Sequence, residues 1–267
     1  MIRDITIGQY IPGDSLIHKS DPRTKIILTF LMMIFIFLVN TYWGYLFLSI
    51  FTALTIVSAD IPFKFVLKGI KPILFIVIFA GVINMFTIGG TPIFELGFLK
   101  MTYEGVDTAI KMSILLFLLI ISASLLTYTT TPIALTDGIE KLMGPLKKIK
   151  VPVHEIAMMM TIALRFIPTL LEETDKIIKA QSSRGADFDS GNMIQRAKSF
   201  IPVLIPLFIS AFRRADELAT AMEARCYRGS EGRTRMKQLS FTKYDFIISV
   251  ITVAFIVWVM VMQSMVW

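Results

Sequence analysis

Two arginines stand at matching places in a repeated stretch between residues 151 and 229. Each follows an aspartate by nine residues, Asp175 to Arg184 and Asp216 to Arg225, and an Ile-Pro pair precedes each aspartate. The aspartates and arginines are offset by 41 residues and the Ile-Pro pairs by 38, so the repeat is imperfect by three residues. A guanidinium offers a planar fork of donors that a carboxylate on a partner can receive as a bidentate pair. We interpret the stretch as two arms that present one arginine each to two partners.

Small residues flank both arginines, Ser183 and Gly185 in the first arm and Ala224 and Cys226 in the second. Such flanks let an arginine enter a groove without steric clashes. The last turn of a helix also attracts a cation through its free carbonyls and macrodipole, and Gly185 could simply end the helix. Cys226 gives no support for a left-handed backbone at its position, because that conformation favours glycine. Since the same pattern occurs twice, we favour docking over helix termination alone.

No other residues suggest catalysis, a cofactor or a metal site. The predicted membrane spans carry no ionisable side chain in their interiors, which argues against ion-coupled transport and against an intramembrane enzyme. His18 and His154 are isolated and Cys226 is the single cysteine, so the sequence shows neither metal-ligand spacing nor a nucleophile beside a base. A G-x-x-x-x-G-K-[ST] loop is also missing, so the chain does not bind ATP by that mechanism. We predict a non-catalytic subunit, and any ATPase must be another chain.

The composition is that of a membrane protein. The 267 residues are 55% hydrophobic and 18% charged, with a mean hydropathy of +0.69, which is far more apolar than a soluble domain. We predict an all-α, polytopic membrane protein with about five transmembrane helices and a cytoplasmic domain of long amphipathic coupling helices. Each predicted span approaches the roughly 20 residues that cross a bilayer. These spans are 26–43, 44–59, 71–88, 106–128 and 246–267, with a turn at Asn40-Thr41 and a short loop over 93–104.

The basic residues orient these spans. The formal charge is +7, and if the N-terminus is cytoplasmic, only Lys100 and Lys111 of the 27 Lys and Arg lie outside or at the outer boundary. Because cytoplasmic segments carry the excess of Lys and Arg, we predict a cytoplasmic N-terminus and an outside C-terminus. The basic residues flank apolar runs instead of clustering with aromatics on a soluble domain, so nucleic-acid binding is not expected. Asp21 and Pro22 are predicted as the N-cap and first residue of the first span.

The pattern divides the chain into three regions: a membrane domain with spans 1–4 in residues 1–128, a cytoplasmic coupling domain in 129–243 and a final transmembrane helix in 244–267. The apolar parts of the arms are shorter than a span and are charged at their ends. We expect their apolar N-terminal halves to pack under the spans and their polar C-terminal halves to project into the cytoplasm. A second hypothesis is a self-sufficient secondary transporter of six or seven spans, in which the arms cross the bilayer. Cysteine labelling at positions 190 and 230 would separate the two.

Five motifs also carry a family resemblance. They are Ile11-Pro-Gly-Asp-Ser15, Leu16 to His18 leading into Asp21-Pro-Arg-Thr-Lys25, Arg165-Phe-Ile-Pro168, Gln181-Ser-Ser-Arg-Gly-Ala186 and Ala221-Met-Glu-Ala-Arg-Cys-Tyr227. Over essentially its whole length the chain resembles the transmembrane T components of energy-coupling factor (ECF) transporters, the CbiQ-like family. In that family two x-Arg-x motifs end the coupling helices and dock into two cytoplasmic ABC ATPases.

The resemblance implies that Ser183, Arg184 and Gly185 bind one ATPase. It assigns Ala224, Arg225 and Cys226 to the other. Ser183 stands where the family usually has alanine, and Cys226 where it usually has glycine, but both residues are small.

The resemblance further implies a subunit of an ATP-driven vitamin or metal-ion importer in a prokaryotic plasma membrane. ATP binding would close the two ATPases, the arms would scissor, and their apolar halves would move the membrane helices. A separate S component would bind the vitamin or metal ion, and one or several interchangeable S components could share this subunit. The substrate contacts then belong to another chain, and this chain requires no cofactor.

Overall fold

Two compact units make up the chain. The computed structural model describes residues 10–96, 99–188, 192–229 and 238–265. Residues 10–142 and 238–265 form a helical bundle, which we call the bundle unit, and residues 143–229 form the arm unit. Positions 190 and 230, chosen above for labelling, lie outside the described residues.

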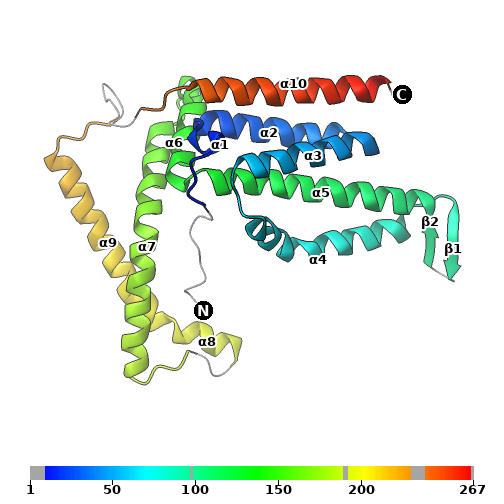
Figure 1. Cartoon of the computed structure of the whole chain (residues 1–267). Coiled ribbons are helices and arrows are strands. Elements are labelled where there is room, and N and C mark those ends of the chain that lie inside the picture. The colour runs from blue at the N-terminus through cyan, green and yellow to red at the C-terminus, as the bar shows by residue number, and fades with distance from the viewer. Residues whose placement is uncertain (1–9, 97–98, 189–191, 230–237, 266–267) are drawn as a thin grey trace. The chain divides into compact units, whose positions relative to one another are not determined.

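The bundle unit is built almost wholly of helices (Figure 1). Its helices are α1 (Leu16–Lys19), α2 (Pro22–Leu38), α3 (Tyr42–Ser58), α4 (Phe63–Thr87), α5 (Tyr103–Thr129), α6 (Pro132–Leu142) and α10 (Lys243–Met265). The chain is therefore all-α and polytopic, as the composition predicts.

Polar side chains at the helix starts fix several of these bounds. Asp21 is the N-cap of α2 with Pro22 at the first helical position, as predicted, and its Oδ1 accepts a hydrogen bond from Arg23 N at 2.9 Å. Thr41 caps α3 in the same way and places the turn where Asn40-Thr41 predicts it. Because the turn comes here, α2 ends at Leu38, five residues before the end of the predicted span.

Within the described residues, four helices are long and apolar enough to cross a membrane, and the bent helix α4 makes a fifth if its two parts count as one span. The two parts of α4, Phe63–Lys71 and Ile73–Thr87, meet at 55°. Pro72 lies at the break, and a proline inside a helix removes one backbone hydrogen bond. The number of candidate spans therefore agrees with the prediction.

The helices that qualify as candidate spans are not all the ones that were predicted. The α2 and α3 helices have 17 residues each, about 25 Å of helix against a hydrocarbon core of about 30 Å. Both helices are slightly too short to qualify as spans by length. By contrast Val153–Ser183 and Ile194–Ala224, which contain the two arms, do qualify. Their helices are longer than the apolar segments on which the prediction rested.

Large apolar side chains fill the centre of the bundle and also cover its outside. Ile36, Val39, Leu48 and Val259 are among the fully buried residues that join α2, α3 and α10. Many other large apolar side chains are exposed, among them Phe30, Ile34, Phe37, Phe75 and Phe79. A soluble protein would not expose so many, whereas hydrocarbon tails can cover them.

A β-hairpin replaces the predicted short loop over 93–104, so that prediction was wrong. Strand β1 (Pro92–Leu96) pairs antiparallel with β2 (Leu99–Thr102), with Glu95 opposite Lys100. The backbone hydrogen-bonding groups of this connection therefore satisfy each other in a ladder. Helix α5 then begins at Tyr103, three residues before the predicted span.

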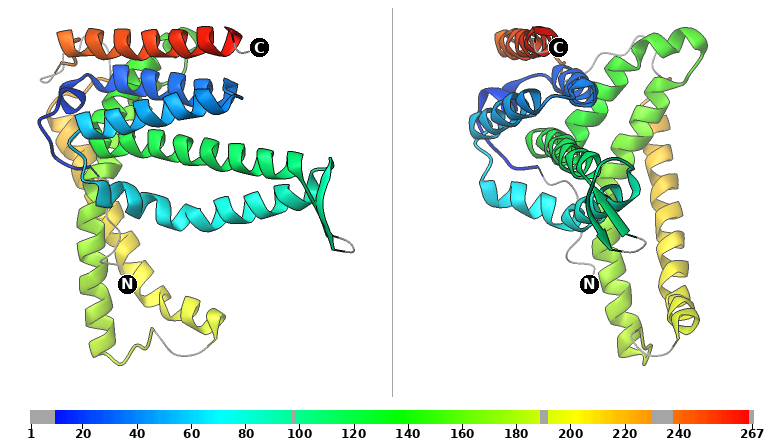
Figure 2. Two further views of the ribbon diagram at one scale, coloured as in Figure 1. Left: turned by 45° about the vertical axis from the view of Figure 1, so that its right-hand side comes forward. Right: turned by 90° about the vertical axis from the view of Figure 1, so that its right-hand side faces the viewer.

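The first and last long helices of the bundle are tied together at their N-terminal ends (Figures 1 and 2). Asp245, 3% exposed, accepts hydrogen bonds from Asp21 N through Oδ1 and from Thr242 N and Oγ1 through Oδ2, all at 2.6 Å. Arg23 forms a bidentate pair with Asp21, and its guanidinium lies 4.2 Å from the centroid of the Phe241 ring. We call these five residues the polar clamp.

The clamp also stabilises the charged form of Asp21. Burial raises the pKa of this carboxyl. The hydrogen bonds from the side chain and backbone of Arg23 lower the pKa, and together with the nearby positive charges they outweigh the effect of burial, so the pKa lies below its ordinary value. Asp21 therefore remains ionised and keeps its bidentate pair with Arg23.

We predict that Asp245→Ala lowers the free energy of unfolding by about 2–3 kcal/mol, because three hydrogen-bond donors lose a charged acceptor. Thermal unfolding of the purified chain in detergent measures the effect. Asp14→Ala is the matched control, since the Asp14 side chain is fully exposed. An Asp245→Ala chain that unfolds at the wild-type temperature would show that the clamp does not stabilise the bundle.

Candidate functional site

The two predicted arms are the long helices of the arm unit. A 3₁₀ helix, η2 (Gly144–Ile149), precedes α7 (Val153–Ser183), and α8 (Met193–Ser199) leads into α9 (Ile201–Ala224). Figures 1 and 2 show that α7 and α9 run in opposite directions, and they pack against each other. Both helices contain an internal proline, Pro168 and Pro206. The predicted arms are therefore confirmed as helices.

The apolar halves of the arms are largely uncovered. Val203 is the one buried residue among the described side chains of α9, and only Val153 and Ala157 are buried in α7. The exposed apolar residues in the first half of α9 are Ile201, Leu204, Ile205, Phe208, Ile209 and Phe212. Such a face needs a membrane or another protein to cover it. That it packs under the spans remains a prediction.

Both arms end in the same backbone turn. In the first, Gly185 N donates to Ser182 O and Ala186 N donates to Gln181 O, both at 3.0 Å. In the second, Cys226 N donates to Glu223 O at 2.9 Å and Tyr227 N to Met222 O at 3.0 Å. This paired 5→2 and 6→1 pattern is the Schellman motif, which satisfies carbonyls that a helix end leaves free. The arginines occupy the equivalent C-cap position in the two motifs.

Cys226 adopts the left-handed conformation, with a φ of 56° against 89° for Gly185. Nothing in the residue type predicts this conformation at a cysteine. A residue with a Cβ is disfavoured there by about 1–2 kcal/mol, so the two hydrogen bonds of the motif must outweigh the local cost. The repeat is therefore closer in backbone geometry than in residue type.

All six predicted docking residues are exposed: Ser183, Arg184, Gly185, Ala224, Arg225 and Cys226. Among the described residues, neither the Arg184 nor the Arg225 guanidinium forms a hydrogen bond or an ion pair. Open space surrounds Gly185. Each arm thus presents an unpaired guanidinium at a turn whose neighbouring side chains are small.

An ion pair joins the arms where they pack together. Arg214 Nη2 lies 2.8 Å from Glu173 Oε2, and both side chains are partly buried. These positions are 41 residues apart (214 − 173), the same offset that relates Arg225 to Arg184. In a two-fold arrangement a residue near the axis meets its own counterpart. The contact therefore indicates an approximate two-fold relation between the arms, with Glu173–Arg214 near its axis.

The two arginines lie equally far along the helices from this contact. Each is 11 residues beyond its member of the pair (184 − 173 and 225 − 214), or about 16 Å at 1.5 Å per residue. Because α7 and α9 are antiparallel, the two ends extend from the contact in opposite directions. The geometry suits two similar partners, one at each end.

The sequence did not identify Glu173 and Arg214, although the 41-residue offset could have paired them. It also missed Asp245, because nothing in the sequence links that residue to Asp21. The two histidines have structural contacts. His18 Nδ1 lies 2.7 Å from Ser15 Oγ and its Nε2 lies 3.0 Å from Ile11 O, and His154 Nε2 lies 3.4 Å from Tyr227 Oη.

The described part of the chain contains no cluster of three or more His, Cys, Asp or Glu residues that could hold a metal. The arm unit instead presents exposed cationic groups at two helix ends, an arrangement that suits docking to another protein.

Comparisons with known proteins cover nearly the whole chain and point to the same family. The model of the CbiQ family, described as cobalt transport protein, matches residues 13–236. Three relatives carry the name energy-coupling factor transporter transmembrane protein EcfT. The relative from Ruminiclostridium cellulolyticum is 80% identical over 263 residues, 98% of each chain. That from Clostridium kluyveri is 58% identical over 251 residues, 93% of each chain. That from Bacillus subtilis is 50% identical over 257 residues, 95% of this chain and 97% of the relative.

We predict that Glu173→Arg alone widens the distribution of distances between the two arm ends, because it places two cations at the α7–α9 contact. The double variant Glu173→Arg/Arg214→Glu restores opposite charges and should restore the wild-type distribution. Spin labels at Ser183→Cys and Ala224→Cys, in a Cys226→Ser chain, report this distance by pulsed electron paramagnetic resonance.

Glu172→Arg is the matched control, since Glu172 is exposed beside the pair. The ion pair does not position the arms if Glu173→Arg leaves the distances unchanged or if the charge exchange fails to restore them.

Proposed function

The chain belongs to the CbiQ family of cobalt transport proteins, as a transmembrane T component of an energy-coupling factor transporter, and on this premise we propose that its arms couple two cytoplasmic ABC ATPases to a separate S component. It is a multi-pass protein of a prokaryotic plasma membrane. This chain is then a non-catalytic subunit, and the two ATPases hydrolyse the ATP. The S component binds the vitamin or metal ion that is imported.

The observation that carries the proposal is the matched pair of arm ends. Arg184 and Arg225 occupy the same position of the same turn, are exposed, and have no partner in the described part of the chain. A carboxylate in a groove on each ATPase would receive the guanidinium as a bidentate pair. Because the arms lack internal partners for these cations, docking costs no existing ion pair.

The contact at Glu173–Arg214 gives the proposed coupling a mechanism. When ATP binding brings the ATPases together, each pulls one arm end, and the arms turn about the place where they are held together. The ends lie at equal distances on opposite sides of this contact. Equal displacements of two similar ATPases would therefore rotate both arms by the same amount. The apolar halves of α7 and α9 then transmit the motion to the membrane helices or the S component that contacts them.

The exposed apolar face of the arms supports contact with the S component and with lipid. The first half of α9 exposes Phe208 and Phe212 at 60% and 70%, and contact with an apolar partner would remove this area from water. One S component or several interchangeable ones would use the same face, because apolar contacts tolerate changes of shape better than hydrogen bonds do.

We propose that α2, α3, α4, α5 and α10 are the spans, with the N-terminus cytoplasmic and the C-terminus outside. The arms then lie in a cytoplasmic block of residues 129–243 that also contains α6. Five charged residues in the second half of α7 support this placement, because a helix that crossed the bilayer would bury them. They are Glu172, Glu173, Asp175, Lys176 and Lys179. The length of α7 and of Ile194–Ala224 favours the competing secondary transporter, in which both cross.

We predict that the double variant Arg184→Glu/Arg225→Glu no longer co-purifies with the ATPases although it still inserts in the membrane, because each docking carboxylate would face another carboxylate. Co-purification from detergent-solubilised membranes, with quantification of each subunit, measures the loss. Arg213→Glu is the matched control, as an exposed arginine on α9. If the double variant retains its ATPases and transport, the arginines are not the docking residues.

We also predict that residues 182 and 226 react with a membrane-impermeant maleimide only from the cytoplasmic side. Cys226 is the single natural cysteine and is exposed; Ser182→Cys in a Cys226→Ser chain reports the end of α7. Labelling of right-side-out and inverted vesicles compares the two faces. If the arms crossed the bilayer, positions 182 and 226 would label from opposite sides, and the secondary transporter would be the better description.

A further inference from the structure

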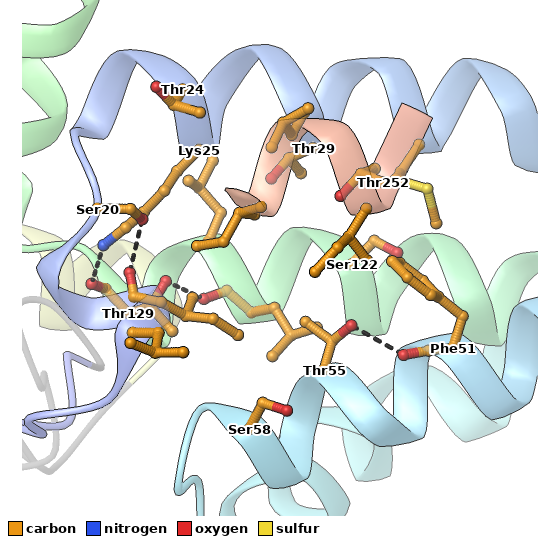
Figure 3. Close-up of a pocket in the computed structure, with 18 of the residues that line it drawn as sticks. Ser20, Thr24, Lys25, Thr29, Phe51, Thr55, Ser58, Ser122, Thr129 and Thr252 are labelled. Atoms are coloured by element: carbon orange, nitrogen blue, oxygen red, sulfur yellow. Dashed lines mark hydrogen bonds between the residues drawn. The ribbon is translucent and has the colours of Figure 1, made fainter. Parts of the chain in front are cut away.

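The bundle unit contains a cavity of about 360 Å³ between α1, α2, α3, α5 and α10 (Figure 3). Its lining residues recur on one face of each long helix, as with Lys25, Leu28, Thr29 and Met32 of α2. The cavity therefore extends along the helices, and the rise from Lys25 to Met32 is about 10 Å. Its wall is overwhelmingly apolar.

One end of the cavity is polar. Figure 3 shows Ser20, Lys25 and Thr129 gathered there, whereas Ser122 and Thr252 lie toward the other end. Lys25 is 8% exposed, and its Nζ donates to Thr129 O at 2.9 Å and to His18 O at 3.1 Å. An ammonium group has three N–H donors. The third has no acceptor within the described residues, so it is free to bind a group inside the cavity.

The wall holds further hydroxyl groups without partners. Thr52, Ser122 and Thr252 are each more than nine-tenths buried, line the cavity, and make no side-chain hydrogen bond within the described part of the chain. Hydroxyls between membrane helices normally bond a neighbouring helix or their own backbone. Here the three residues line the cavity instead.

The cavity reaches the outer surface of the bundle. Leu54, Ile247 and Ile251 line it and are about half exposed. Since the chain is a membrane protein, the material next to this rim is the acyl region of the bilayer. An apolar slot that opens there and ends at a buried ammonium matches a molecule with a long chain and an oxygen-rich head.

We propose that this cavity binds one phospholipid of the surrounding bilayer, with one acyl chain along the slot and a phosphodiester oxygen accepting the third N–H of Lys25. The volume lies within the range of small-molecule sites, which are mostly apolar with a few placed polar groups. The bound chain fills the space between α2, α3, α5 and α10 and holds them apart at this separation. The site is independent of ATPase docking by the arms.

Native mass spectrometry of the chain, purified in mild detergent with the subunits that accompany it, tests the proposal. One retained phospholipid per chain is expected for the wild type. Thr252→Phe fills the slot, so retention should fall at least tenfold. Val253→Phe is the matched control, because Val253 is exposed on the same helix and does not line the cavity. Lys25→Met, which removes the ammonium donors, should reduce retention several-fold.

Retention by Thr252→Phe at the wild-type level, or a wild-type complex without bound phospholipid, would overturn the proposal. The second result would assign the cavity to water or to a side chain of a partner. If Thr252→Phe does not fold, Ser122→Leu narrows the slot from α5 and carries the same expectation. The thermal midpoint of delipidated wild type should rise when phosphatidylglycerol is added back, and that of the filled variant should not.

Discussion

Asp245 accepts three hydrogen bonds at the place where the first and last long helices of the bundle begin. A buried carboxylate is stable only when such donors surround it. This one joins the chain near residue 21 to the chain near residue 245 and so closes the bundle. Helix α6 also approaches the start of α2 closely: a Cβ at Gly138 would lie 3.1 Å from Pro22 Cβ. Both α6 and α10 are therefore held at the start of α2.

The ends of both arms satisfy the backbone carbonyl groups that every helix end leaves unpaired. The last carbonyls of α7 and α9 need donors, and the same turn supplies them in both arms, once with glycine and once with cysteine in the left-handed position. Because the turn fixes the direction of the preceding C-cap residue, it also fixes where each arginine leaves the helix. The structural need to end the helix and the proposed need to present a cation are thus met by the same few residues.

Length and apolar character alone do not separate the five proposed spans from the arms. The α7 helix and Ile194–Ala224 qualify by length, whereas α2 and α3 do not. The distinction lies in where the charges fall. In α2 the charged residues, Arg23 and Lys25, lie in the first turn and α3 has none, while α7 carries a charged second half that includes Glu173, which contacts Arg214. That pairing makes α7 and α9 partners of each other, and their apolar halves remain available to something outside the chain.

Composition and local sequence determined much of this protein. The membrane character, the turn at Asn40-Thr41, the cap at Asp21, the helical arms and the repeated arginines were all predicted, because each depends on residues that are close in sequence or on the overall hydrophobic content. Other features were decided by tertiary structure. The Asp21–Asp245 and Glu173–Arg214 contacts join residues far apart in the chain, and the cavity around Lys25 exists only because five helices leave it between them. The left-handed turn at Cys226 was also not evident, since the residue type disfavours it and only the hydrogen bonds of the completed helix end make it favourable.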